Sequence, residues 1–249
     1  MKNISNKTAG DKLIFALDAN NYEEALSWVK LLSDHVGMFK VGKELFTAVG
    51  PKIIESIKKR GQKVFLDLKF HDIPNTVARA AQAAVRLNVD MFNVHASGGA
   101  QMIKEAVTAA WTCADNIAGT RPIVLAVTVL TSLNNADLAE IGFPGTTGEQ
   151  VLHLARLAQK AGASGVVASA QDIAVLRANL GDKFIIVTPG IRGADVKTKD
   201  DQKRTLSAYE AVKTGADYIV VGRPISTAQE PLEACRQIVQ EIADGLAAR

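Results

Sequence analysis

Residues 63–76 read KVFLDLKFHDIPNT and place a charged strand end directly before the start of a helix. The first half of this stretch has the composition of a β-strand. Alternate side chains of a strand share a face, so Phe65, Asp67 and Lys69 are expected to point one way and the aliphatic residues between them the other way. One wall of this strand is therefore apolar, and the opposite wall carries the charges.

The charged residues of this stretch each have two interpretations. Burying a carboxylate and an ammonium costs free energy unless each meets an opposite charge, so Asp67 and Lys69 either form a structural ion pair or serve a reaction. Asp72 lies just before Pro74, where a carboxylate stabilises the positive end of a helix that opens with proline. The rest of the chain has to separate these alternatives.

Length and composition favour one α/β domain. The chain has 249 residues, of which 47% are hydrophobic. This is enough for one large core, although length alone would also allow two domains. We expect a single domain over residues 1–249, with a polar N-terminal tail at 1–12. The net charge of +3 comes from Lys and Arg scattered among Asp and Glu, so no basic patch indicates nucleic-acid binding.

Targeting and cross-linking signals are missing from the sequence. The polar start lacks the apolar core of a secretory signal, and no apolar run reaches membrane-spanning length. Cys113 and Cys235 are the two cysteines and lie far apart, so we expect both to be reduced and buried, with no disulfide and no zinc site. These features predict a cytoplasmic protein that binds neither a membrane nor nucleic acid.

Strand-like and helix-like segments alternate along the whole chain. The predicted strands cover residues 13–18, 38–42, 63–70, 90–96, 122–130, 165–169, 184–188 and 218–222. The predicted helices cover residues 22–33, 43–60 with an interruption at 50–51, 74–87, 100–113, 149–161, 173–179, 205–214 and 225–243. The two long connections, 131–148 and 189–203, are candidates for moving lids.

Eight such units in about 250 residues are what a closed (β/α)₈ TIM barrel requires. A doubly wound open sheet is the alternative, but the first strand lacks the G-x-G-x-x-G turn of a dinucleotide-binding fold. The active site of a barrel lies at the C-terminal ends of its strands. The residues predicted at these ends are Asp18, Lys40, Asp67, Lys69, His95, Ser97, Thr131, Ser132, Arg192, Gly222 and Arg223.

The last two strands carry a possible phosphate site. Residues 188–192 (TPGIR) and 222–225 (GRPI) put glycines, arginines and a helix start where barrels often bind phosphate. Gly222 would let a ligand reach backbone N–H groups, and Arg223 would supply a forked donor. The alternative for the second motif is a helix-capping turn with a solvated arginine.

The segment DLKFHDIPNT at 67–76 resembles the signature of the orotidine 5′-phosphate decarboxylase family. Further segments similar to that family are LD at 17–18, FKVG at 39–42, VLTS at 129–132, TPGIR at 188–192 and VGRPI at 221–225. The resemblance implies a dimeric barrel that removes CO₂ from orotidine 5′-phosphate to give UMP, the last step of pyrimidine synthesis. It also implies that neither metal nor cofactor is used.

The resemblance implies roles for individual residues as well. The catalytic cluster falls on Lys40, Asp67, Lys69 and Asp72, and Lys69 is expected to protonate the carbon that loses CO₂. Asp72, Ile73 and Thr76 are expected to reach the site of the neighbouring subunit. The residues implied to bind substrate are Asp18, Lys40, Asp67, Asp72, Ile73, Thr76, Thr131, Ser132, Arg192, Gln202, Gly222 and Arg223.

Two competing functions are weighed against this one. A magnesium-dependent sugar-phosphate decarboxylase or aldolase of the same barrel group shares the Asp-x-Lys-x-x-Asp pattern, but it places an acid at the end of the second strand. Here that position is Lys40, and a cation there would repel Mg²⁺. A binding barrel without activity is the third class, in which an inward-facing Asp–Lys pair has little purpose.

Overall fold

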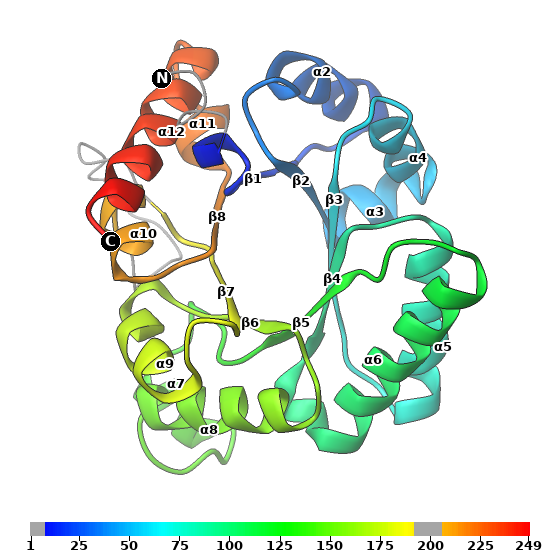
Figure 1. The fold of residues 1–249 in the computed structure, drawn as a ribbon, viewed down its shortest axis with the longest axis vertical. Coiled ribbons are helices and arrows are strands. Elements are labelled where there is room, and N and C mark those ends of the chain that lie inside the picture. The colour runs from blue at the N-terminus through cyan, green and yellow to red at the C-terminus, as the bar shows by residue number, and fades with distance from the viewer. Residues whose placement is uncertain (1–7, 192–205) are drawn as a thin grey trace.

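The computed structural model describes residues 8–191 and 206–249, and in it eight parallel strands close into a barrel (Figure 1). The closure is made by β1, which pairs with β2 on one side and with β8 on the other. The predicted (β/α)₈ fold is therefore confirmed. The strands are β1 (Leu13–Ala16), β2 (Met38–Gly42), β3 (Val64–Phe70), β4 (Met91–His95), β5 (Ile123–Val127), β6 (Gly165–Val167), β7 (Ile185–Thr188) and β8 (Tyr218–Val221).

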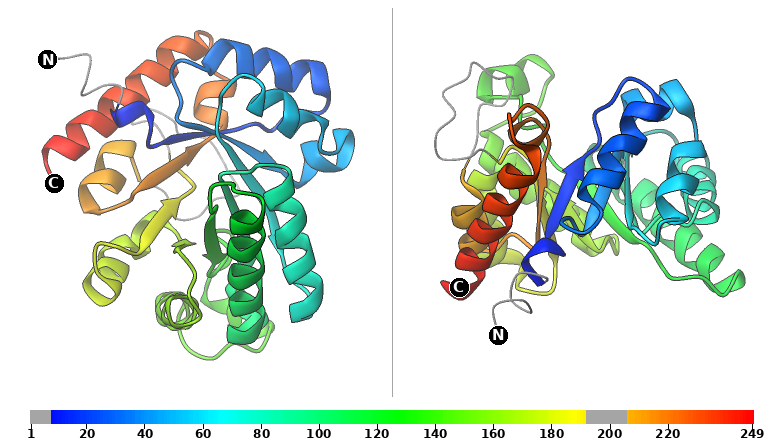
Figure 2. Two further views of the ribbon diagram at one scale, coloured as in Figure 1. Left: turned by 45° about the vertical axis from the view of Figure 1, so that its right-hand side comes forward. Right: turned by 90° about the horizontal axis from the view of Figure 1, so that it is seen from above.

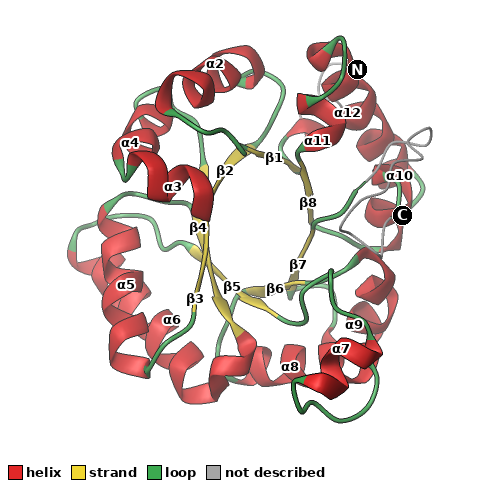
Figure 3. Ribbon diagram, turned by 180° about the vertical axis from the view of Figure 1, so that it is seen from behind, coloured by secondary structure: helices red, strands yellow, loops and turns green. Residues whose placement is uncertain are grey.

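Helices surround the barrel on all sides, as the view from behind shows (Figure 3). Helices α5 and α6 pack side by side over β3 and β4 (Figure 2). The helices are α2 (Tyr22–Leu32), α3 (Lys43–Val49), α4 (Lys52–Lys58), α5 (Pro74–Arg86), α6 (Gly99–Asn116), α7 (Asn135–Glu140), α8 (Thr147–Lys160), α9 (Ile173–Leu180), α10 (Ala208–Thr214), α11 (Arg223–Ser226) and α12 (Pro231–Ala247). Two 3₁₀ turns, η1 (Ala96–Gly98) and η2 (Ala170–Asp172), precede α6 and α9.

The period of two along each strand divides the buried residues into two clusters. The larger cluster lies between strands and helices, and the smaller one fills the inside of the barrel. The buried members of the inner cluster are Ile14, Ala16, Met38, Phe65, Met91, Leu125, Val187 and Val220. The inside of the barrel is therefore a packed core below its C-terminal rim, and a cavity opens above this core at the rim.

The rim is polar on one side and apolar on the other. Continuing the inward alternation past the core residues of the first four strands leads to Asp18, Lys40, Asp67 and Asn93. On the other half of the ring, Val127, Val167, Pro189 and Val220 line the rim cavity. A ligand held there meets charges on one side and hydrocarbon on the other.

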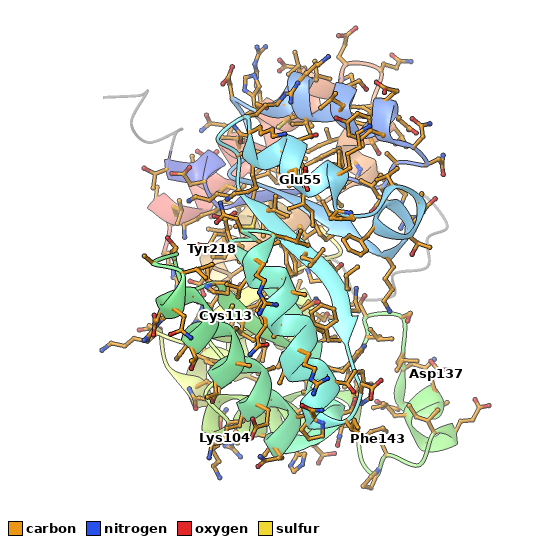
Figure 4. All side chains as sticks on the ribbon, turned by 90° about the vertical axis from the view of Figure 1, so that its right-hand side faces the viewer. Glu55, Lys104, Cys113, Asp137, Phe143 and Tyr218 are labelled. Carbon is orange, nitrogen blue, oxygen red and sulfur yellow. The ribbon has the colours of Figure 1, made fainter. Side chains whose placement is uncertain are left out.

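Apart from shifts of a few residues at element ends, the structure differs from the predicted elements in two places. The connection 131–148, predicted without regular structure, contains α7, whose N-cap Asn134 exchanges hydrogen bonds with Asp137 in a capping box. Figure 4 shows Asp137 and Phe143 on this segment, which stands out from the body of the barrel. The predicted final helix 225–243 is divided into α11 and α12, and Pro231 begins the second helix because its missing N–H and fixed φ suit a first turn.

Two expectations about the chemistry of the chain can be compared with the described residues. Cys113 and Cys235 are free and buried, as predicted. Across residues 8–191 and 206–249, no helix combines the length and the apolar character needed to cross a bilayer. Residues 1–7 of the predicted tail lie outside the described residues.

Candidate active site

A cavity of about 690 Å³ opens at the C-terminal ends of the strands. This volume is within the ordinary range for small-molecule sites, roughly 300–1,000 Å³. Its walls come from the ends of every strand except β4 and β7, and from loop residues that include Thr131, Pro189 and Gly190. The predicted site residues that line it are Asp18, Lys40, Asp67, Lys69, Thr131, Gly222 and Arg223.

Four of these residues form a chain of alternating charges along one wall of the cavity. Nζ of Lys40 lies 3.4 Å from Oδ1 of Asp18 and 3.4 Å from Oδ2 of Asp67. Nζ of Lys69 lies 2.7 Å from Oδ1 of Asp67. The Asp67 carboxylate is thus shared by two ammonium groups, one on each oxygen, and its side chain is only 12% exposed.

This environment keeps Asp67 ionised. Burial alone would raise the pKa of Asp67, but the charges of Lys40 and Lys69, with hydrogen bonds from Lys69 and Asn93, lower it below its ordinary value. A carboxylate that is negative near neutral pH therefore lies in a cavity that is apolar on its far side. Burying these charges costs free energy. An ion pair with only a structural role would not need a ligand-sized cavity beside it, so the arrangement indicates a functional site.

An irregularity in β3 places Lys69 in the cavity. Phe65 and Leu66 pair with Met91 and Phe92, but the next pair is Phe70 with Val94. The residues 67–69 are therefore opposed by the single residue 93. Lys69 takes a left-handed backbone conformation, with φ of 53°, which side chains other than glycine rarely adopt. Phe65, Asp67 and Lys69 share the cavity as expected, although a bulge and not regular pleating brings Lys69 there.

Asn93 was not predicted as a site residue, yet it contacts both charged residues of β3. Its Nδ2 donates to Oδ1 of Asp67 at 2.7 Å, and its Oδ1 accepts from the backbone N–H of Lys69 at 2.8 Å. The side chain is 1% exposed. A polar residue inside the apolar strand MFNVH was the available signal, since a buried amide needs partners for its donors and acceptor.

Gly222 and Arg223 close the cavity at the end of β8. A methyl group added to Gly222 would lie 3.2 Å from Cβ of Ala16 and 3.5 Å from Oδ2 of Asp18. The absence of a side chain here lets the backbone after β8 approach the end of β1 and leaves room for a ligand beside it. Arg192 and Gln202, predicted to bind the same phosphate, lie outside the described residues.

The residues around the start of α5 do not line the cavity. Asp72, Ile73 and Thr76 are exposed, and the side chain of Ile73 is 66% exposed. Asp72 accepts a hydrogen bond from the backbone N–H of Ile73 at 2.7 Å, while the N-cap of α5 has no side-chain hydrogen bond. Asp72 therefore does not cap the helix, and none of these residues lines the cavity of its own chain. Ser132 is exposed beside the lining residue Thr131.

His95 lies at the edge of this region and packs against a second histidine. The rings of His71 and His95 are 5.3 Å apart between centroids. Burial, followed by the charges of His71, Lys43 and Lys69, lowers the pKa of His95 to about 4, and Asp67 opposes this shift only in part. His95 is therefore neutral near pH 7.

Lys40 decides whether the carboxylates can hold a metal ion. Its ammonium lies at 3.4 Å from both Asp18 and Asp67, the place where a divalent cation would have to bridge them. Among the described residues, no group of three or more His, Cys, Asp or Glu side chains has the geometry to hold a metal ion. The donor set thus does not fit Mg²⁺, since the positive charge between the acids is already supplied by the protein.

A closed parallel barrel with a charged cavity at the C-terminal ends of its strands defines the molecule as a (β/α)₈-barrel enzyme. Residues 11–238 match the family model described as orotidine 5′-phosphate decarboxylase / HUMPS family. The chain belongs to this family.

Curated relatives match over nearly the full length of both chains. The orotidine 5′-phosphate decarboxylase of Syntrophus aciditrophicus is 57% identical over 249 residues, covering 100% of this chain and 99% of the relative. That of Geotalea daltonii is 52% identical and covers 94% and 97%. A crystal structure of orotidine 5′-phosphate decarboxylase from Lactobacillus acidophilus has a TM-score of 0.82 at 40% identity, covering 92% of this chain and 98% of that one. The resemblance drawn from residues 67–76 is therefore confirmed at the level of the family.

Proposed function

We propose that the chain catalyses decarboxylation of orotidine 5′-phosphate to UMP, the last step of pyrimidine synthesis, without metal or cofactor. The observation that carries the proposal is the alternating series Asp18, Lys40, Asp67 and Lys69 along one wall of the cavity. The names of the relatives and the family membership support the same substrate.

The reaction needs a fixed positive charge near one carbon. Loss of CO₂ leaves an electron pair on a pyrimidine ring carbon that no adjacent carbonyl delocalises as a simple enolate. The charge has to be met electrostatically, and a preorganised ammonium is suited to this. Lys69 is the donor we assign: its ammonium faces the cavity, stabilises the carbanion and then protonates that carbon.

Asp67 and Lys40 prepare this arrangement. Asp67, ionised and shared between two lysines, would lie beside the substrate carboxylate, so two like charges are crowded until the carboxylate group leaves as neutral CO₂ and its negative charge passes to the ring carbon. Lys40 anchors the second oxygen of Asp67 and joins it to Asp18. Asp18, with Lys40 and Thr76, is assigned to the ribose hydroxyls. Thr131, and Ser132 next to it, are assigned to the pyrimidine.

The phosphate would bind at the end of the cavity away from Lys69, next to Asp18. Gly222 and Arg223 line that end, and Gln202 and Arg192 are assigned to the same group from the sequence. Binding energy from a phosphate remote from the reacting carbon can drive closure of the connections 131–148 and 189–203 and so lower the barrier of the chemical step.

The active form we propose is a homodimer. Asp72, Ile73 and Thr76 are exposed and do not line the cavity of their own chain. An exposed isoleucine beside an aspartate without an ion pair among the described residues is consistent with a surface that a second subunit covers. In the dimer these residues would complete the neighbouring site. A location in the cytoplasm is part of the same proposal.

The competing assignment to a magnesium-dependent sugar-phosphate enzyme is less well supported. Its chemistry requires an acid where this chain has Lys40, and that lysine contacts both candidate carboxylate ligands.

The decisive test is to mix the purified protein with orotidine 5′-phosphate and follow the fall in ultraviolet absorbance as UMP forms. Turnover of a sugar phosphate with Mg²⁺, and none of the nucleotide, would overturn the proposal.

A further inference from the structure

Asn93 lies behind the charged wall of the cavity and holds two of its members at once. Its amide N–H donates to Oδ1 of Asp67 at 2.7 Å, and its amide oxygen accepts from the backbone N–H of Lys69 at 2.8 Å. The same Oδ1 of Asp67 also accepts from Nζ of Lys69 at 2.7 Å. The three residues thus form one closed network. Asn93 is 1% exposed and is therefore shielded from solvent.

The backbone of Lys69 needs such a partner. Between the paired residues Leu66–Phe92 and Phe70–Val94, β3 has three residues and β4 has one. The ladder is interrupted at this point, and a buried N–H without a ladder acceptor needs another acceptor. The amide oxygen of Asn93 replaces it. Lys69 has φ of 53° here, a conformation that persists only where the surroundings impose it.

We propose that Asn93 is a positioning residue for the reactive lysine. Its side chain fixes the Lys69 backbone in the left-handed conformation and anchors the Asp67 carboxylate, so that the ammonium of Lys69 is held at the place where the carbanion forms. This inference rests on the proposed function for the identity of the reaction, but the geometry that it describes belongs to the protein without substrate.

The two hydrogen bonds can be separated by substitution. Asn93→Asp is nearly isosteric and keeps the acceptor for the Lys69 N–H, but it turns the donor toward Asp67 into a second acceptor. Asn93→Ala removes both. Ser164→Ala is a matched control, since Oγ of Ser164 also accepts a backbone N–H across strands, from Val124 at 3.1 Å, but at the N-terminal ends of the strands.

The test measures steady-state kinetics of the full chain with orotidine 5′-phosphate from acid to neutral pH. Asn93→Ala should lower kcat by about 10- to 100-fold and leave KM within about threefold, because it removes one hydrogen bond to the Asp67 carboxylate and one to the Lys69 backbone N–H. The acid limb of its kcat profile should move to higher pH, because Asp67 loses a hydrogen bond that favours its ionised form. A rise in KM with kcat and the pH profile unchanged, or the same kcat loss in Ser164→Ala, would overturn the proposal.

A crystal structure of each Asn93 variant gives a readout that does not depend on turnover. In Asn93→Ala, Lys69 should leave the left-handed region and its Nζ should lose the contact with Asp67. An unchanged Lys69 would overturn the positioning role, even if the wild-type protein decarboxylated the nucleotide. If Asn93→Ala does not fold, the nearly isosteric Asn93→Asp takes its place and should show both the kcat loss and a displaced Asp67. Failure of the wild type on the nucleotide would refute the proposed function alone.

Discussion

The ammonium of Lys40 lies 3.4 Å from the carboxylate of Asp67, whose other oxygen is 2.7 Å from Lys69. One buried acid therefore fixes two cations from two neighbouring strands. The two lysines are not equivalent, because the side chain of Lys69 is 25% exposed and that of Lys40 only 12%. Lys69 is the lysine with more access to a bound substrate, and Lys40 is better placed to hold the cluster together.

Substituting Lys69 by alanine should abolish turnover while leaving nucleotide binding largely intact. The ammonium acts on charge that develops after the substrate is bound, so its loss should lower kcat by about 10³-fold or more and affect the affinity for UMP much less. Kinetics and calorimetric titration with UMP measure the two quantities. Near-normal turnover would remove Lys69 from the role of proton donor.

The control for this variant is Lys58→Ala. Nζ of Lys58 also lies 2.7 Å from a carboxylate, that of Asp90, but at the start of β3 and β4, at the opposite end of the barrel. Its loss should change stability and leave kcat unaltered.

Mixing two inactive variants should restore activity if the site is shared between subunits. In a dimer of one Asp72→Ala and one Lys69→Ala chain, one site regains both wild-type residues and the other has neither. Random assortment of equal amounts should therefore restore about one quarter of the wild-type sites. Each variant alone, at the same total concentration, is the control, and no recovery after subunit exchange would argue against cross-subunit sharing.

The main features of this site were predictable from the sequence because they follow from local periodicity. A period of two brings Asp18, Lys40 and Asp67 to the inner face of three consecutive strands, and parallel strands in a barrel bring those ends to one rim. The alternating charges are therefore a consequence of pattern, and the structure brings them together as expected.

The features that were missed depend on pairing between distant segments. Nothing within β3 shows that Lys69 is left-handed, because the interruption is defined only against β4. The polar Asn93 inside its apolar strand indicates a buried side chain that needs partners, but which partners it has follows only from that interruption. Helix α7 was different: its capping box, Asn134 with Asp137, is local and was an available signal inside a connection treated as a loop.

Activity should survive removal of metal ions. Lys40 provides the positive charge between Asp18 and Asp67, so the reaction as proposed needs no divalent cation. Dialysis against EDTA should leave kcat and KM for orotidine 5′-phosphate unchanged, and added Mg²⁺ should not raise them. A loss that Mg²⁺ restores would revive the metal-dependent alternative.

His95 should make the folded state less stable as the pH falls. Burial and the neighbouring charges of His71, Lys43 and Lys69 lower its pKa to about 4, from an ordinary value of 6.5. Between these two values the unfolded chain binds a proton that the folded chain does not, so the free energy of unfolding decreases as pH falls from about 6.5 toward 4. Above this window His95 is neutral in both states and contributes no pH dependence.

Replacing His95 by glutamine should remove this part of the acid sensitivity. Urea unfolding at pH 7 and pH 5 gives the free energy of unfolding for the wild type and the variant, and the wild type should lose more of it between the two pH values. His153→Gln, at an exposed position on α8, is the matched control and should behave as the wild type does. Equal losses in the wild type and in His95→Gln would mean that the buried imidazole stays accessible to protons in the folded state, and that its packing against His71 does not exclude the charged form.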